Sequence, residues 1–163
     1  MKISLALWNL RSVSNVASIL RTADGFGVKS VYFIGTTPHP TLSNDPRLPH
    51  IRAKMDRVFA KTSLGAEKHL NLAYYGSVEE LQAKLPRPKQ IIALEQTQAS
   101  RVLPDLPKLE DEILLIVGEE RNGLPPEITD VCDSCVEIKM RGTKESLNVA
   151  VATGIALYAL TLK

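Results

Sequence analysis

The chain has 163 residues, with a hydrophobic fraction of 44%, a charged fraction of 23% and a formal net charge of +2. This balance is ordinary for one globular domain, and we expect residues 1–163 to form a single domain without a substrate-recognition extension. The chain lacks a signal-peptide pattern at its start, and its apolar run at 149–162 is too short for a membrane span, so we expect a cytoplasmic protein.

Short apolar runs alternate with segments of helical periodicity along the chain. This alternation predicts an α/β fold, in which a parallel sheet is sandwiched between helices. We expect strands at 3–8, 30–35, 70–76, 90–95, 112–118 and 134–140, and helices at 14–26, 77–85, 124–132 and 146–161, with one more helix near either 51–60 or 62–69.

The predicted helix 14–26 carries the first polar cluster. Its apolar residues recur at helical spacing and predict a buried face, and Ser14 is a candidate N-cap. On another side, Asn15, Ser18 and Arg21 recur at spacings of three residues. An arginine flanked by Asn and Ser is not placed for an ion pair within the helix, so this stripe is either a solvated face or part of a site.

The second polar cluster follows the strand at 112–118. Gly118 lets the backbone approach a ligand closely, and Asn122-Gly123 favours a sharp turn. Loops at the carboxyl ends of parallel strands are where open α/β sheets bind ligands. Neither a Walker loop nor the fingerprint G-x-G-x-x-G occurs in the chain, so this cluster is a ligand loop of another kind or an ordinary turn.

The third polar cluster opens the last predicted helix. Gly142 and Thr143 turn the chain, Ser146 lies near the helix start, and Asn148 lies inside the first turn, where free backbone amides can bind polar ligand atoms. Beyond it, no charged residue occurs until Lys163. A helix with so little polar surface needs cover on all sides, so we expect it to form part of the core and of a subunit interface.

The two cysteines, Cys132 and Cys135, form a C-x-x-C pair. A zinc site would need further ligands, and neither a second pair nor histidines at ligand spacing are present in the sequence. A redox pair usually lies at a helix N-terminus, whereas this pair follows a predicted helix. We therefore expect free thiols and no bound metal.

Together and in this order, the three clusters closely resemble the motifs of the SpoU (TrmH) family of the SPOUT superfamily. The segment NVASILRTADGFGV is similar to the first motif, IVGEERNGLP to the second, and IKMRGTKESLNVAVATGIALY to the third. The likeness covers nearly the whole chain, and the three motifs in register are highly specific. One departure is Ala17, where the family commonly has Gly, but Asn15 and Arg21 are intact.

The resemblance implies an S-adenosylmethionine-dependent methyltransferase that acts on ribose 2′-hydroxyls of RNA. It also implies a deep C-terminal trefoil knot, one of the few exceptions to unthreaded topology. The strand ends would converge with the loop at 146 to bind the cofactor. The residues that the resemblance assigns to the cofactor are Leu94, Glu95, Gly118, Ile138, Met140, Ser146 and Leu147.

The resemblance also implies the catalytic residues, of which Arg21 is the principal one. Arginine is a poor general base because its pKa lies above about 12. We therefore expect Arg21 to clamp a phosphate and orient the 2′-hydroxyl, while the phosphate or a water takes the proton. The residues expected to position the ribose, Arg21 and each other are Asn15, Glu119, Ser146 and Asn148.

Basic residues outside the pocket are the candidates for RNA binding, since phosphate contacts need positive charge. For each of them the alternative is a solvated helix face. The low aromatic content of 5% favours recognition of RNA shape, across a homodimer, over extensive base stacking. The candidates are Arg11, Arg47, Arg52, Lys54, Arg57, Arg121, Arg141 and Lys144.

The sequence thus predicts a ribose 2′-O-methyltransferase of tRNA or rRNA, with tRNA modestly favoured. Three alternatives stay open: a base methyltransferase of the same superfamily, a catalytically silent knotted RNA-binding protein, and a flavodoxin-like nucleotide-binding protein. The Ser-Leu-Asn of the third motif favours ribose, and the retention of Arg21 and Asn148 favours an active enzyme.

Overall fold

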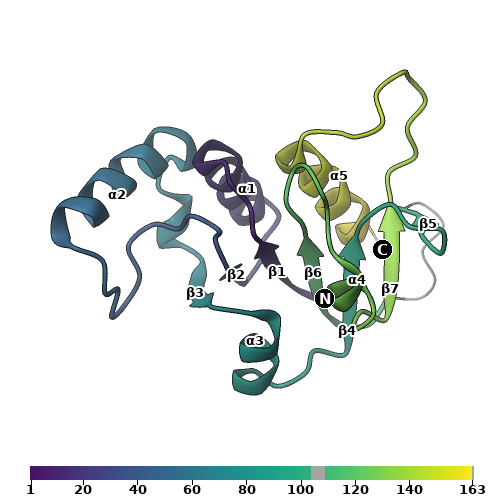
Figure 1. Ribbon diagram of the computed structural model, residues 1–163, viewed down its shortest axis with the longest axis horizontal. Helices are drawn as coiled ribbons and strands as arrows, with labels where there is room; N and C mark the ends of the chain where they lie inside the picture. Colours follow the sequence, from purple (N-terminus) through teal and green to yellow (C-terminus); the bar gives the residue numbers. More distant parts are fainter. Residues whose placement is uncertain (104–108, 163) are drawn as a thin grey trace.

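The computed structural model describes residues 1–103 and 109–162, and in these residues seven strands form one sheet whose neighbours are all parallel. The strand order is β3-β2-β1-β6-β4-β7-β5 (Figure 1). All six predicted strands are confirmed, whereas the two-residue strand β5 was not predicted. The strands are β1 (Lys2–Trp8), β2 (Ser30–Ile34), β3 (Asn71–Tyr75), β4 (Gln90–Leu94), β5 (Arg101–Val102), β6 (Glu112–Val117) and β7 (Ser134–Glu137).

The helices also follow the prediction, with different bounds. The uncertain region at 51–69 forms a long helix and then a short 3-10 turn, and the helix predicted at 124–132 is reduced to a single turn. The elements are α1 (Val13–Gly25), α2 (Pro49–Ser63), η1 (Ala66–Lys68), α3 (Val78–Lys84), α4 (Pro126–Thr129) and α5 (Val149–Thr161).

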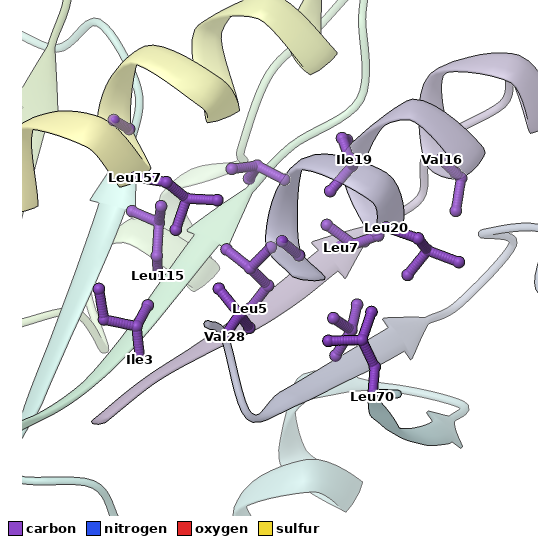
Figure 2. Packing of buried hydrophobic residues seen from close by; sticks show 14 of the residues in the cluster. Ile3, Leu5, Leu7, Val16, Ile19, Leu20, Val28, Leu70, Leu115 and Leu157 are labelled. Atoms are coloured by element: carbon purple, nitrogen blue, oxygen red, sulfur yellow. The ribbon is translucent and has the colours of Figure 1, made fainter. Parts of the chain in front are cut away.

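The sheet has helices on both faces, as predicted. Along β6, Ile113 and Leu115 belong to the core beneath α1 and α5, while Leu114 and Ile116 belong to a second core beneath α3 and α4. Figure 2 shows side chains of α1 and α5 packed against β1 and β6 in the first core. Because both faces are covered, the strands read as continuous apolar runs.

Two predicted helix starts are wrong. Ser12, not Ser14, is the N-cap of α1: its backbone is extended and its Oγ accepts from Asn15 N at 3.2 Å. Asn148 likewise lies just before α5, and its Oδ1 accepts from Val151 N and, at 2.9 Å, from Ala150 N. A capping residue lies just before the helix, where its side chain can reach the free amides of the first turn. Because Asn148 is the cap, Ser146 lies in the loop before α5 and not in the helix.

The last helix is only partly covered by its own chain. Its buried residues are Thr153, Ala156, Leu157 and Leu160. The exposed apolar residues of the helix and its C-cap, between 40% and 68% exposed, are Val151, Ile155, Tyr158 and Leu162, and we call them the α5 stripe. Within residues 1–103 and 109–162, no helix is long and apolar enough to cross a membrane.

Both thiols are free in the described chain, as predicted, and both are partly buried. Burial raises the pKa of Cys132 to about 12, and Cys132 Sγ donates to the Ile128 carbonyl oxygen at 3.2 Å. Burial also raises the pKa of Cys135.

A thiol with so high a pKa forms almost no thiolate near neutral pH, and the thiolate is the nucleophile. We therefore expect iodoacetamide at about pH 8 to label native Cys132 at least tenfold more slowly than the same cysteine in urea. Peptide mass spectrometry over time measures both rates. Equal labelling rates in the two conditions would contradict the buried environment.

Candidate active site

A pocket of about 360 Å³ lies at the carboxyl ends of β4, β6 and β7, where the loop 138–148 also reaches it. Its volume is typical of a small-molecule site. Three segments far apart in the sequence therefore meet here. All the residues predicted to bind the cofactor lie on its wall: Leu94, Glu95, Gly118, Ile138, Met140, Ser146 and Leu147.

The loop 118–124 on one wall of this pocket is folded tightly on itself. Gly123 N donates to the Glu119 carbonyl oxygen at 3.1 Å, and Gly123 has φ +65°, which favours glycine. A Cβ at Gly118 would lie 2.5 Å from the Gly123 carbonyl carbon, so the loop leaves no room for a side chain there.

The Glu95 carboxylate at the end of β4 fixes this loop through a hydrogen bond. Its Oε2 accepts from Leu124 N at 2.6 Å, and its Oε1 accepts from Gln96 N at 2.9 Å. A Cβ at Gly123 would overlap the Glu95 carboxylate. Glu95 therefore lines the pocket as predicted, but its oxygens are used to fix the end of β4 against the loop 118–124.

A polar network joins the three motifs beside the pocket. Asn148 Nδ2 donates to Asn15 Oδ1 at 3.0 Å, and Asn15 Nδ2 donates to Glu120 Oε1 at 2.9 Å. Glu120 also accepts from the backbone amides of Arg11 and Ser12 at the start of α1. Partial burial alone would raise its pKa, but these hydrogen bonds hold the pKa of Glu120 below its usual value, so it is a carboxylate at neutral pH.

Glu120 was not predicted from the sequence, where Glu119 was chosen. Glu119 lines the pocket but points to different partners, forming an ion pair with Arg11 Nη2 at 3.1 Å and accepting from Asn122 Nδ2. The two acids are neighbours of the same type, so only the fold shows that Glu120 is the one that reaches Asn15.

Arg21 does not reach the pocket within one chain. Among the described residues, those that line the pocket do not include it, and its side chain is exposed on α1. Arg21 lies six residues beyond Asn15, which corresponds to about 9 Å along the helix. The next residue, Thr22, lies against α5, because a Cβ at Gly154 would be 3.5 Å from Thr22 Cγ2.

All but one of the predicted RNA-binding residues fall into two groups, which lie on elements far apart in Figure 1. The first group borders the pocket: Arg121 lies on the pocket wall, and Arg141 and Lys144 are exposed on the loop 138–148. The second lies on α2, at the other end of the molecule. The first group is Arg11, Arg121, Arg141 and Lys144, and the second is Arg52, Lys54 and Arg57.

Arg47 belongs to neither group, because it lies in the loop 35–48. Its guanidinium pairs with the fully buried carboxylate of Asp45 and donates to the carbonyl oxygens of His39 and Pro40, at 3.1 and 3.0 Å. The Arg47 hydrogen bonds hold the pKa of Asp45 well below its usual range. The guanidinium is therefore used to shape the loop 35–48.

The fold and the pocket define a class: an open, parallel α/β sheet with a ligand site where its strands end. The sequence matches the SpoU rRNA Methylase family over residues 2–158, and the chain belongs to this family. This confirms the family indicated by the three motifs.

Three similar proteins illustrate the match. The tRNA (guanosine(18)-2'-O)-methyltransferase of Aquifex aeolicus is 28% identical over 151 residues, which cover 92% of this chain and 64% of the relative. The 23S rRNA (guanosine-2'-O-)-methyltransferase RlmB of Coxiella burnetii is 26% identical, covering 94% and 56%. A crystal structure of an AdoMet-bound rRNA methyltransferase from Sinorhizobium meliloti superposes with a TM-score of 0.79 at 23% identity, covering 97% and 55%. The chain thus spans less than two thirds of the length of these relatives.

Proposed function

We propose that the protein is an S-adenosylmethionine-dependent RNA methyltransferase that methylates a ribose 2′-hydroxyl of tRNA or rRNA, with tRNA modestly favoured. The observation that carries this proposal is that the second and third family motifs form one pocket, to which Asn15 of the first motif is joined through Glu120 and Asn148. The names of the relatives, which act on tRNA and on rRNA, support the same reaction.

The walls of the pocket fit S-adenosylmethionine. Leu94, Ile138 and Leu147 supply apolar contacts for the adenine and the thioether region, and the exposed backbone at the strand ends can bind the polar edge of the base. When bound, this cofactor supplies a methyl group that is already activated on a sulfonium, so the transfer needs no metal.

The polar network positions the other reactant. Asn15, Glu120 and Asn148 fix the first turns of α1 and α5 relative to each other, and they offer amide and carboxylate groups to a ribose. Glu119 and Ser146, on the pocket wall, complete the polar surroundings. A reacting hydroxyl held near contact distance and in line with the methyl group gains most of the rate enhancement available from positioning.

The protein works as a homodimer that pairs through the α5 stripe. Val151, Ile155, Tyr158 and Leu162 recur at spacings of four, three and four residues, and they form a continuous exposed apolar face. Such a face on a helix normally marks an interface. A two-fold axis through this face pairs the same surface of both copies.

The dimer gives Arg21 its role. Arg21 is exposed on α1, where the adjacent Thr22 lies against α5, and it lies outside the pocket of its own chain. Pairing through the stripe brings Arg21 toward the second copy. We therefore infer that its guanidinium clamps a phosphate of the RNA at the pocket of the partner subunit, where the geometry of a planar fork suits a phosphate.

We also infer that residues 1–163 act as one cytoplasmic domain with a knotted C-terminus. The chain leaves β7 on the far side of β4, lines the pocket with residues 138–147, and returns to pack α5 against α1. This path crosses the carboxyl ends of β4 and β6. The loop 118–124 lies on the same pocket as the crossing segment, and this placement supports threading of the last segment.

The nucleosides of cellular RNA test the proposed function. Mass spectrometry of tRNA and rRNA from cells with and without the gene is expected to show one 2′-O-methylated nucleoside missing in the deletion. The purified protein is then expected to restore it on the unmodified RNA with S-adenosylmethionine. Cofactor binding without methylation of any RNA would instead support the silent RNA-binding alternative.

The α5 stripe provides a test of the dimer. Ile155→Glu places a charge in the proposed interface, so we expect a monomer in light scattering and loss of methyl transfer, with the fold retained in circular dichroism. Val58→Glu, at a similarly exposed apolar residue on α2, is the matched control and is expected to stay dimeric. A dimeric Ile155→Glu protein would place the interface elsewhere.

A further inference from the structure

A second cleft, of about 740 Å³, lies at the carboxyl ends of β2 and β3 between residues 35–47 and 72–74. It occurs at the same edge of the sheet as the candidate active site, since all the strands are parallel. In the order β3-β2-β1-β6-β4, β2 of this cleft and β4 of the candidate active site are three strand spacings apart, or about 14 Å. A few nucleotides of single-stranded RNA span such a distance.

One wall of this cleft is an aromatic side chain held rigidly. Tyr74 is 45% exposed, its hydroxyl donates to the Gly35 carbonyl oxygen at 3.0 Å, and its ring centroid lies 5.2 Å from that of His39. His39 in turn lies 5.6 Å from Phe33, which is fully buried. Tyr74 is thus the outer member of an aromatic row anchored in the core, and an exposed ring of this kind suits a stacked nucleobase.

The rest of the cleft is preformed, and both polar and apolar residues line it. Thr41 N and Oγ1 both donate to the Asp56 carboxylate at 2.7 Å, which ties the loop to α2, and Arg47 ties the other end through Asp45. Burial, followed by a smaller effect of Arg47, lowers the pKa of His39, so its ring is neutral at neutral pH. The cleft therefore presents an aromatic wall without an added charge.

We propose that this cleft binds a nucleobase of the substrate RNA, a few nucleotides from the methylated ribose. The proposal rests on the proposed function, and it adds a base-binding subsite to it. Arg11, exposed at the end of β1 between the two sites, lies on the path of the connecting phosphates. The exposed basic residues Lys54 and Arg57 of α2, which follows the cleft loop, favour RNA over a neutral partner.

The variants Tyr74→Ala and Tyr74→Phe test this subsite in the full chain. Loss of one stacked base is expected to raise KM for the RNA found by nucleoside analysis about tenfold in Tyr74→Ala, with kcat and the Kd of S-adenosylmethionine unchanged. Tyr74→Phe keeps the ring and is expected to stay within about twofold of wild type. A folded Tyr74→Ala protein with an unchanged KM would overturn the subsite.

A crosslinking experiment on the wild-type protein does not depend on the stability of a variant. The same RNA, with 4-thiouridine placed in turn at each uridine position near the target, is irradiated on the protein and the attached peptide is sequenced. One flanking position is expected to attach within residues 35–47 or 71–75. Attachment only elsewhere overturns the subsite, whereas a wild-type protein that methylates no RNA overturns the proposed function itself.

Discussion

Arg21→Ala is expected to lower kcat for methyl transfer by at least about 10²-fold while the Kd of S-adenosylmethionine stays within about twofold of wild type. The reason is that Arg21, which lies outside the pocket of its own chain, is proposed to hold a phosphate of the RNA at the partner's pocket. Its loss then misplaces the 2′-hydroxyl and leaves the residues that line the cofactor pocket unchanged. Single-turnover kinetics with unmodified RNA and calorimetry with the cofactor measure the two effects separately.

Two further variants show which property of Arg21 matters. Arg21→Lys keeps the charge and loses the planar fork, so we expect it to recover only a small part of the lost rate. Lys29→Ala removes an exposed positive charge near the opposite edge of the sheet and is expected to have wild-type activity. If Arg21→Ala lost cofactor binding and turnover together, the phosphate-clamp role would be wrong.

The strands were the part of the fold that the sequence predicted best. In β6, residues 113–117 point alternately into the two cores, so both faces of the strand are covered. Such a strand is a continuous apolar run, and its composition alone is enough to predict it. The ends of helices were predicted less well, because Ser12 and Ser14 have the same capping chemistry and only the backbone conformation distinguishes them. The strand β5 has two residues and leaves no pattern to detect.

The pocket wall was also predictable, because the motifs carry their residues in fixed order along strand ends. The hydrogen-bond and ion-pair partners of neighbouring residues of the same type could not be predicted. Glu119 and Glu120 differ only in which way the loop turns them, and Arg47 looked like its basic neighbours although Asp45 neutralises it. Asp45 stands two residues before Arg47, so this ion pair had a signal in the sequence that was overlooked.

Gly118→Ala is expected to raise the Kd of S-adenosylmethionine about tenfold or more. The added methyl would lie 2.5 Å from the Gly123 carbonyl carbon and 2.7 Å from Leu124 N, which are backbone atoms that cannot rotate away. The loop 118–124 must then shift, and overpacking of this kind costs about 1–3 kcal/mol. Since Glu95 holds the same loop through Leu124 N, the shift also disturbs the end of β4.

Calorimetry gives the Kd, and thermal unfolding shows whether the chain is still folded. Gly25→Ala is the control, because a Cβ there meets no atom within 4 Å. Unchanged cofactor affinity in a folded Gly118→Ala protein would mean that the loop 118–124 does not form the cofactor site.

Arg21→Ala and Gly118→Ala together decide where Arg21 acts, when both are assayed at an S-adenosylmethionine concentration far below the raised Kd, where Gly118→Ala also has little activity. In a dimer of Arg21→Ala with Gly118→Ala, the first subunit has an intact pocket and the second an intact Arg21. If Arg21 serves the partner's pocket, a statistical mixture of the two is expected to regain about a quarter of the wild-type activity, since half the dimers are mixed and each holds one complete site. If Arg21 serves its own pocket, no mixed dimer contains a complete site and the mixture stays inactive.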